Sequence, residues 1–76
     1  MTIANDRRLR AIVRTANMQR RLRTVLRKLP DDALAVRLGR YTGRTKSEVK
    51  TEYRWWYSAN LNRERLIDAI VRIEVP

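Results

Sequence analysis

Apolar residues recur at helical spacing through the first third of the chain, where they form two separate stripes. One stripe consists of Leu9, Ile12, Val13 and Ala16, and the other of Met18, Leu22, Val25, Leu26 and Leu29. At about 100° per residue, the second stripe lies nearly opposite the first. The chain therefore either breaks near residues 15–17 or forms one helix over residues 5–29 that buries opposite sides at its two ends. We favour the single helix because no Gly or Pro forces a break.

A second, shorter helix is expected after Pro30, which ends the first. Its apolar stripe consists of Leu34, Leu38 and Tyr41. Asp31 or Asp32 can cap its start. Gly39 and Gly43 are poor helix residues and limit it to about ten residues.

A third helix is predicted over residues 46–59 by a T-x-x-E capping box at Thr45 and Glu48, in which each side chain satisfies a backbone N–H at the helix start. The apolar stripe of this helix consists of Val49, Tyr53, Trp56 and Tyr57. Its outward positions are Lys46, Ser47, Lys50, Thr51 and Arg54. Trp55 lies off the apolar stripe, so we expect it to be exposed.

The last segment predicts a helix over residues 62–73. Its inward positions are Leu66, Ile67, Ile70 and Val71. A terminal strand over residues 71–75 is the alternative. The whole pattern predicts one mainly α domain over residues 1–76, a small bundle of about four helices with a helix-turn-helix-like pair within residues 31–59.

Charge is distributed unevenly along the chain, whose net charge is +10. Residues 1–30 carry nine Arg or Lys and one acid, whereas residues 31–76 carry nine Arg or Lys and seven acids. Arginine supplies 15 of the 18 basic residues, and its planar guanidinium suits phosphate groups and guanine edges. The first third of the chain is therefore expected to meet an anionic partner.

The cations of the first helix form their own stripe. Arg7, Arg14, Arg21 and Lys28 recur every seven residues, with Arg10 beside them. Like charges three and four residues apart destabilise an isolated helix by a few tenths of a kcal/mol per pair, which favours a phosphate-binding face over an ordinary solvated one. The candidate phosphate contacts are Arg7, Arg10, Arg14, Arg21, Lys28, Arg44 and Thr45.

Catalysis has little support in the composition. The chain contains no Cys and no His, which excludes disulfides and leaves no thiolate or imidazole for a zinc site. The usual catalytic base and nucleophiles are missing with them. Glu48 and Glu52 lie four residues apart on one helix face, but Glu48 is needed for the cap. We therefore expect a protein that is not an enzyme and has no cofactor or metal.

Membrane insertion and secretion are not expected either. No apolar run approaches the roughly 18 residues of a membrane span, and charge interrupts the first residues before a signal sequence could form. We expect a cytoplasmic protein, associated with the nucleoid if it binds DNA.

The pair of helices on either side of "RYTGRT" indicates how DNA could be contacted. In a helix-turn-helix, the N-terminal residues of the second helix meet base edges in the major groove. Small polar and basic residues suit that position. The candidate base-contacting residues are Lys46, Ser47, Lys50, Thr51 and Arg54. A plain bundle helix and a protein-docking helix are the alternatives.

The segment "LPDD…TGRTKSEV" over residues 29–49 also resembles ribbon-helix-helix repressors and antitoxins, which are dimers that place a two-stranded ribbon in the major groove. The resemblance covers about 21 of the 76 residues, and "TGRTKSE" is its most specific part. It implies a ribbon over residues 23–29, with Thr24, Leu26 and Lys28 facing the bases and Thr45, Lys46 and Ser47 touching phosphate.

These patterns predict a sequence-specific double-stranded DNA-binding protein, a small transcriptional regulator that forms a homodimer. Trp55 could stack on an unpaired base or anchor the dimer. One alternative is an RNA-binding protein that inserts its Arg-rich N-terminal helix into structured RNA. The others are a small adaptor or inhibitor that binds an acidic protein surface, and a basic helix lying on a membrane surface.

Overall fold

The protein is built from four helices, as the apolar pattern predicts. A computed structural model describes residues 3–55 and 60–76, with side chains described from Arg7 onward. The helices are α1 (Ile3–Arg27), α2 (Asp31–Thr42), α3 (Lys46–Glu52) and α4 (Arg63–Glu74). Apart from one isolated bridge between Arg54 and Leu61, the described part of the chain contains no strand pairing. The mainly α fold class is therefore confirmed.

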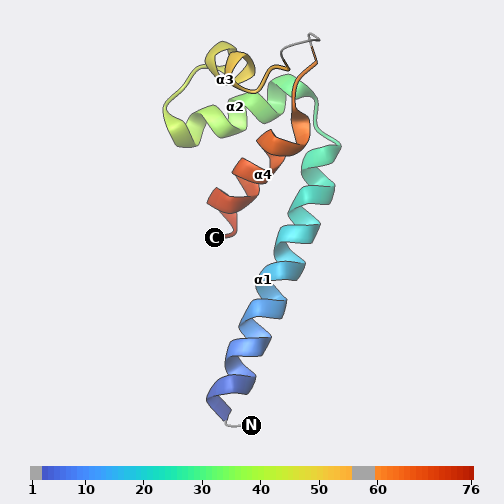
Figure 1. Cartoon of the computed structure of the whole chain (residues 1–76), viewed down its shortest axis with the longest axis vertical. Coiled ribbons are helices and arrows are strands. Elements are labelled where there is room, and N and C mark those ends of the chain that lie inside the picture. The colour runs from blue at the N-terminus through green and yellow to red at the C-terminus, as the bar shows by residue number, and fades with distance from the viewer. Residues whose placement is uncertain (1–2, 56–59) are drawn as a thin grey trace.

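The helices are arranged as a small bundle with one long projecting arm (Figure 1). α4 lies beside the C-terminal half of α1, α2 and α3 lie near the C-terminal end of α1, and the N-terminal half of α1 extends beyond them. α2 packs on both α3 and α4, and α4 packs on α1. The molecule measures 51 × 23 × 20 Å, and α1 runs along its longest dimension.

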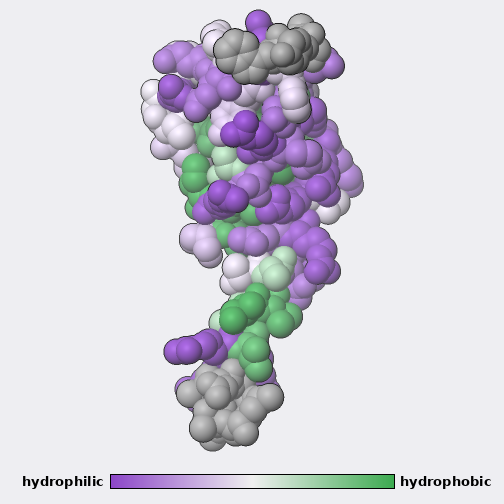
Figure 2. Space-filling view, viewed as in Figure 1, coloured by the Kyte–Doolittle hydropathy of each residue, from purple (hydrophilic) through white to green (hydrophobic). Residues whose placement is uncertain are grey.

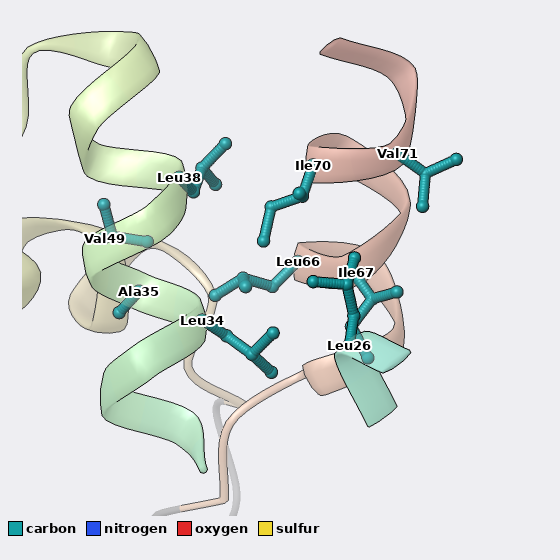
Figure 3. Close-up of a cluster of buried hydrophobic side chains, with 9 residues drawn as sticks. All are labelled: Leu26, Leu34, Ala35, Leu38, Val49, Leu66, Ile67, Ile70 and Val71. Atoms are coloured by element: carbon teal, nitrogen blue, oxygen red, sulfur yellow. The ribbon is translucent and has the colours of Figure 1, made fainter. Parts of the chain in front are cut away.

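The core is a single apolar cluster to which all four helices contribute (Figure 3). Its buried members are Leu26 from α1, Leu34, Ala35 and Leu38 from α2, Val49 from α3, and Leu66, Ile67, Ile70 and Val71 from α4. The inward positions predicted for the last helix are all buried, and its predicted bounds differ from the observed ones by one residue. The alternative of a strand over residues 71–75 is wrong, because the helix continues to Glu74.

The prediction of one unbroken first helix is confirmed, but the prediction that both of its apolar stripes are buried is wrong. Leu26 is fully buried and Leu22 packs against the core, whereas Leu9, Ile12 and Val13 are at least half exposed. The reason is the length of α4. The side chain of Gln19 donates a hydrogen bond to the Val75 carbonyl at 2.8 Å, so α4 ends level with the middle of α1.

α2 is longer than its glycines suggest. It runs for twelve residues to Thr42 and then ends at Gly43, whose φ of 70° is left-handed. Gly39 lies inside the helix, where a Cβ would overlap the carbonyl oxygen of Arg44. The predicted caps Asp31 and Asp32 occupy the first turn instead, after Pro30 in the N-cap position. Tyr41 is 51% exposed, so it does not join the core.

α3 begins as predicted and ends early. The Thr45 hydroxyl accepts from the Glu48 backbone N–H at 3.2 Å, and the Thr45 N–H donates to the Glu48 carboxylate at 3.1 Å, which confirms the capping box. The helix ends at Glu52, so the prediction of a helix to residue 59 is wrong.

Hairpin-like pairing replaces the predicted last turns of this helix. The N–H of Asn62 donates to the Tyr53 carbonyl at 2.8 Å, and the N–H of Trp55 donates to the Asn60 carbonyl at 3.1 Å. Aromatic residues favour extended pairing over a helix, which accounts for the early end of α3. Tyr53 packs partly against the core, while Trp56 and Tyr57, also predicted to be buried, lie outside the described residues.

Candidate nucleic-acid interface

The carboxylates of residues 31–76 are occupied within the bundle. Glu48 forms the cap of α3, and the other six acids form ion pairs with Arg or Lys. The pairs are Asp31 with Arg63, Asp32 with Lys46 and Lys50, Glu52 with Arg44, Glu64 with Arg27, Asp68 with Arg23 and Arg72, and Glu74 with Arg37. Most of these pairs join different helices, so these acids neutralise the bundle and not the projecting arm.

The predicted phosphate contacts on α1 are placed along one exposed side of the helix. Arg14, Arg21 and Lys28 are exposed, and none of them forms an ion pair with a described carboxylate. Arg7 and Arg10 continue the same stripe toward the N-terminus and are also exposed. A seven-residue spacing drifts by only about 20° per repeat, and 21 residues of helix span about 31 Å. The structure therefore brings Arg7, Arg10, Arg14 and Arg21 together as one stripe on α1, and Lys28 follows directly after the helix ends at Arg27.

The predicted base-contacting residues of α3 have a different electrostatic setting. Lys50 and Lys46 both approach the carboxylate of Asp32, at 2.7 and 3.5 Å. The hydrogen bond from Lys50 is the main cause that lowers the pKa of Asp32, and the charge of Lys46 adds to it. One carboxylate therefore offsets part of the charge of two lysines.

Ser47 and Thr51 are exposed on the same helix. The Thr51 hydroxyl donates to the Ser47 carbonyl at 2.9 Å. Arg44, a predicted phosphate contact, is paired with Glu52, and Thr45 is committed to the cap. These side chains remain accessible to a ligand, but those of Arg44, Thr45 and Thr51 already have an internal partner.

Arg54 and Trp55 do not belong to α3. Arg54 is bridged to Leu61 after the helix has ended, so its prediction as an outward residue of the third helix is wrong in position. It is still exposed. Trp55 is 54% exposed, as expected from its place off the apolar stripe.

The two predicted groups of contacts lie on different parts of the molecule. α3 packs on α2, and α2 separates it from α4 and from the arm formed by α1 (Figure 1). The stripe on α1 and the residues of α3 therefore form two surfaces, and a duplex would have to bend or be long enough to reach both.

An exposed apolar surface is the feature that sequence analysis missed. Leu9 and Val13 line a shallow groove of about 490 Å³ together with the polar residues Arg10, Arg14, Asn17 and Arg21. The sequence did contain an indication of this exposed surface, namely the difference in length between the first and the last predicted helix. A twelve-residue helix spans about 18 Å and can cover only half of a 25-residue helix, which spans about 37 Å.

The described residues offer little for other chemistry. Residues 3–55 and 60–76 hold no cluster of three or more potential metal ligands. Within the same part of the chain, no helix combines the length and apolar content needed to cross a bilayer. Comparisons with models of known families, with curated proteins and with solved structures found no match.

Proposed function

We propose that this protein binds double-stranded DNA and acts as a small transcriptional regulator. The observation that carries the proposal is the stripe of exposed cations along α1, defined by Arg7, Arg10, Arg14, Arg21 and Lys28. Phosphate groups would supply negative charge to these cations, which form no ion pair with a described carboxylate. Arginine is suited to that contact because its guanidinium can bind two phosphate oxygens at once.

The dimensions of α1 support a duplex as the partner. The stripe spans about 31 Å, close to the roughly 34 Å of one helical turn of DNA. The major groove, about 12 Å wide, admits an α-helix. Contacts distributed along such a helix would be strongly salt-dependent, because each neutralised phosphate releases counterions.

The α2–α3 pair is the second contact in this proposal. Residues 43–45 connect the two helices, and a connection of three or four residues with a Gly is typical of a helix-turn-helix. Lys46, Ser47, Lys50 and Thr51 would supply the base contacts. Lys50 and Lys46 would exchange Asp32 for phosphate oxygens or base edges. Trp55, outside both surfaces and half exposed, is the candidate anchor of a homodimer.

The experiment that tests the phosphate contacts is fluorescence anisotropy with labelled random duplex DNA, titrated over a range of salt concentrations. Arg14→Ala and Arg21→Ala should each reduce the slope of log K against log salt by about 1. The matched control is Arg72→Ala, which removes the same charge from α4, where the side chain of Arg72 is paired with Asp68. No duplex binding at physiological salt, or an equal effect of the control, would overturn the proposal.

Sequence selectivity is tested with the same assay after a preferred site has been selected from random duplexes. Lys50→Ala should weaken binding to that site by about 1–3 kcal/mol and weaken random duplex less. Equal losses on both would remove α3 from the base contacts. A matched structured RNA is run alongside, and tighter binding of the RNA would favour an RNA-binding function through α1.

A further inference from the structure

The N-terminal part of α1 carries an apolar surface that nothing in the described structure covers. We call residues 3–14 the free half of α1, and Leu9, Ile12, Val13 and Ala16 the apolar stripe. Every described side chain from Arg7 to Arg14 is exposed. Ile12 is 60% exposed and Val13 57%. In Figure 2 hydrophobic residues gather on the arm below the bundle, with polar residues beside them.

Arginines border the apolar stripe. Arg10 and Arg14 lie beside it in the shallow groove. By the helical repeat, Arg8 lies on its other side and Arg20 lies one turn beyond Ala16. None of these arginines is paired with a described carboxylate, so the surface combines an apolar centre with a positively charged border.

Three kinds of ligand could cover such a surface: a second copy of this chain, a lipid bilayer or a helix of another protein. The distribution of charged and apolar residues on α1 distinguishes between them. A second copy of this chain would place the same arginines against one another, since residues 7–28 contain no acid. A bilayer would require one continuous apolar side. Met18 and Val25, the next exposed apolar residues of α1, lie on the opposite side of the helix, so a flat membrane would meet only about two turns.

We propose that the apolar stripe binds an acidic amphipathic helix of another protein. Its apolar residues would pack on Leu9, Ile12 and Val13, as in other helix-in-groove interactions. Its carboxylates would pair with Arg10 and Arg14 on one border and with Arg8 on the other. Charge complementarity of this kind speeds association and excludes partners of the same sign.

This inference does not depend on DNA binding. The apolar stripe and the cation stripe lie on adjacent sides of α1 and share Arg10 and Arg14 at their border. If both ligands bind, the acidic helix and the duplex compete for these two arginines. The apolar contacts are specific to the protein partner, because phosphate groups do not pack against apolar side chains.

The test uses the full-length protein and three labelled synthetic peptides of equal length, measured by anisotropy at physiological salt. The first peptide has Leu at helical spacing and Glu elsewhere. The second has the same composition in scrambled order, and the third has Gln in place of Glu. The first peptide should bind at least about tenfold more tightly than the other two.

Matched variants show whether the stripe itself is the site. Ile12→Gln and Val13→Gln should each weaken binding of the acidic amphipathic peptide by about tenfold or more. Met18→Gln and Val25→Gln change residues that are equally exposed on the opposite side of α1 and should leave it unchanged. All four positions are exposed, so circular dichroism should show the same helix content.

Four outcomes would overturn the proposal. Equal binding of the scrambled peptide, or no effect of Ile12→Gln and Val13→Gln, would leave only non-specific charge attraction. A dimer in sedimentation experiments that Ile12→Gln dissociates would assign the stripe to a second copy. Tighter binding to phosphatidylserine vesicles than to the acidic peptide, lost in Ile12→Gln, would assign it to a membrane.

Discussion

Two leucines of α1 show how one residue type takes two roles in one helix. Leu26 is completely buried and Leu9 is 50% exposed, although each belongs to an apolar stripe of the same period. The difference is the presence of α4 and α2 around Leu26 (Figure 3). Helical periodicity identifies the side of a helix that is suited to burial, but burial itself depends on what packs there.

Alanine substitutions of these two leucines measure how much each side chain contributes to the free energy of unfolding. Leu26→Ala should lower the free energy of unfolding by about 2–5 kcal/mol, because it removes buried methyl groups and leaves a cavity. Leu9→Ala should change it by less than about 0.5 kcal/mol. Urea unfolding followed by circular dichroism gives both values. A comparable loss in Leu9→Ala would mean that the free half of α1 packs against the protein after all.

At the level of the elements, polar contacts fix how α2 and α4 are placed. The guanidinium of Arg37 donates two hydrogen bonds of 2.5 Å to the carboxylate of Glu74. The side chain of Glu74 is only 15% exposed. The hydrogen bonds from Arg37 hold the pKa of Glu74 below its ordinary value of 4.5, against the opposing effect of burial. This ion pair joins α2 to the C-terminal end of α4.

The lowered pKa of Glu74 predicts an acid-dependent loss of stability. A carboxyl group whose pKa is depressed by folding stabilises the native state fully above its unfolded pKa, near 4.5, and loses that contribution as the pH falls through the folded pKa. Unfolding measured between pH 7 and pH 2 should therefore show a flatter decline in Glu74→Gln than in the wild type. In an Arg37→Gln background the difference between the two profiles should shrink, because the main cause of the lowered pKa of Glu74 is then removed, and an undiminished difference would contradict this origin.

The sequence was sufficient to predict most of the elements, because their apolar residues follow the helical period and their starts carry recognisable signals. The capping residues Thr45 and Glu48 predicted the start of α3. The apolar residues between Leu66 and Val71 predicted the buried side of α4. The end of α3 was not predictable from periodicity, since Val49 and Tyr53 fit a longer helix equally well. The ion pairs of Lys46 and Lys50 with Asp32 could not be predicted either, because they depend on how α2 and α3 meet in space.

At the scale of the whole molecule, the acids of residues 31–76 are kept apart from the projecting arm. The bundle contains the acids of residues 31–76 and pairs them with its own cations, whereas α1 extends away from it with a stripe of exposed arginines (Figure 1). The two proposed binding surfaces of α1 both depend on this separation. We expect the fold to tolerate loss of the arm, whereas peptide binding should be lost and DNA binding weakened.

Deleting residues 1–14 tests whether the arm contributes to binding and not to the stability of the bundle. The melting temperature should change by less than about 4 °C, because none of the described side chains of residues 7–14 belongs to the core and 1 kcal/mol corresponds to roughly 4–8 °C in a domain of this size. Binding of the acidic amphipathic peptide should be lost, and the salt slope of DNA binding should fall by about 3 with the loss of Arg7, Arg10 and Arg14. A large drop in melting temperature would show that the arm supports the bundle.

The low stability of the free half of α1 also affects the free energy with which it binds its ligands. A helix of this length without tertiary packing is only marginally stable in water, and repulsion among its arginines lowers that stability further. Its amide hydrogens should therefore exchange with solvent far faster than those of the segment around Leu26. Any anionic ligand must hold the arm in helical form as it binds, so part of the contact energy is used for ordering. The intrinsic helix propensity of residues that touch no ligand thus becomes a determinant of affinity.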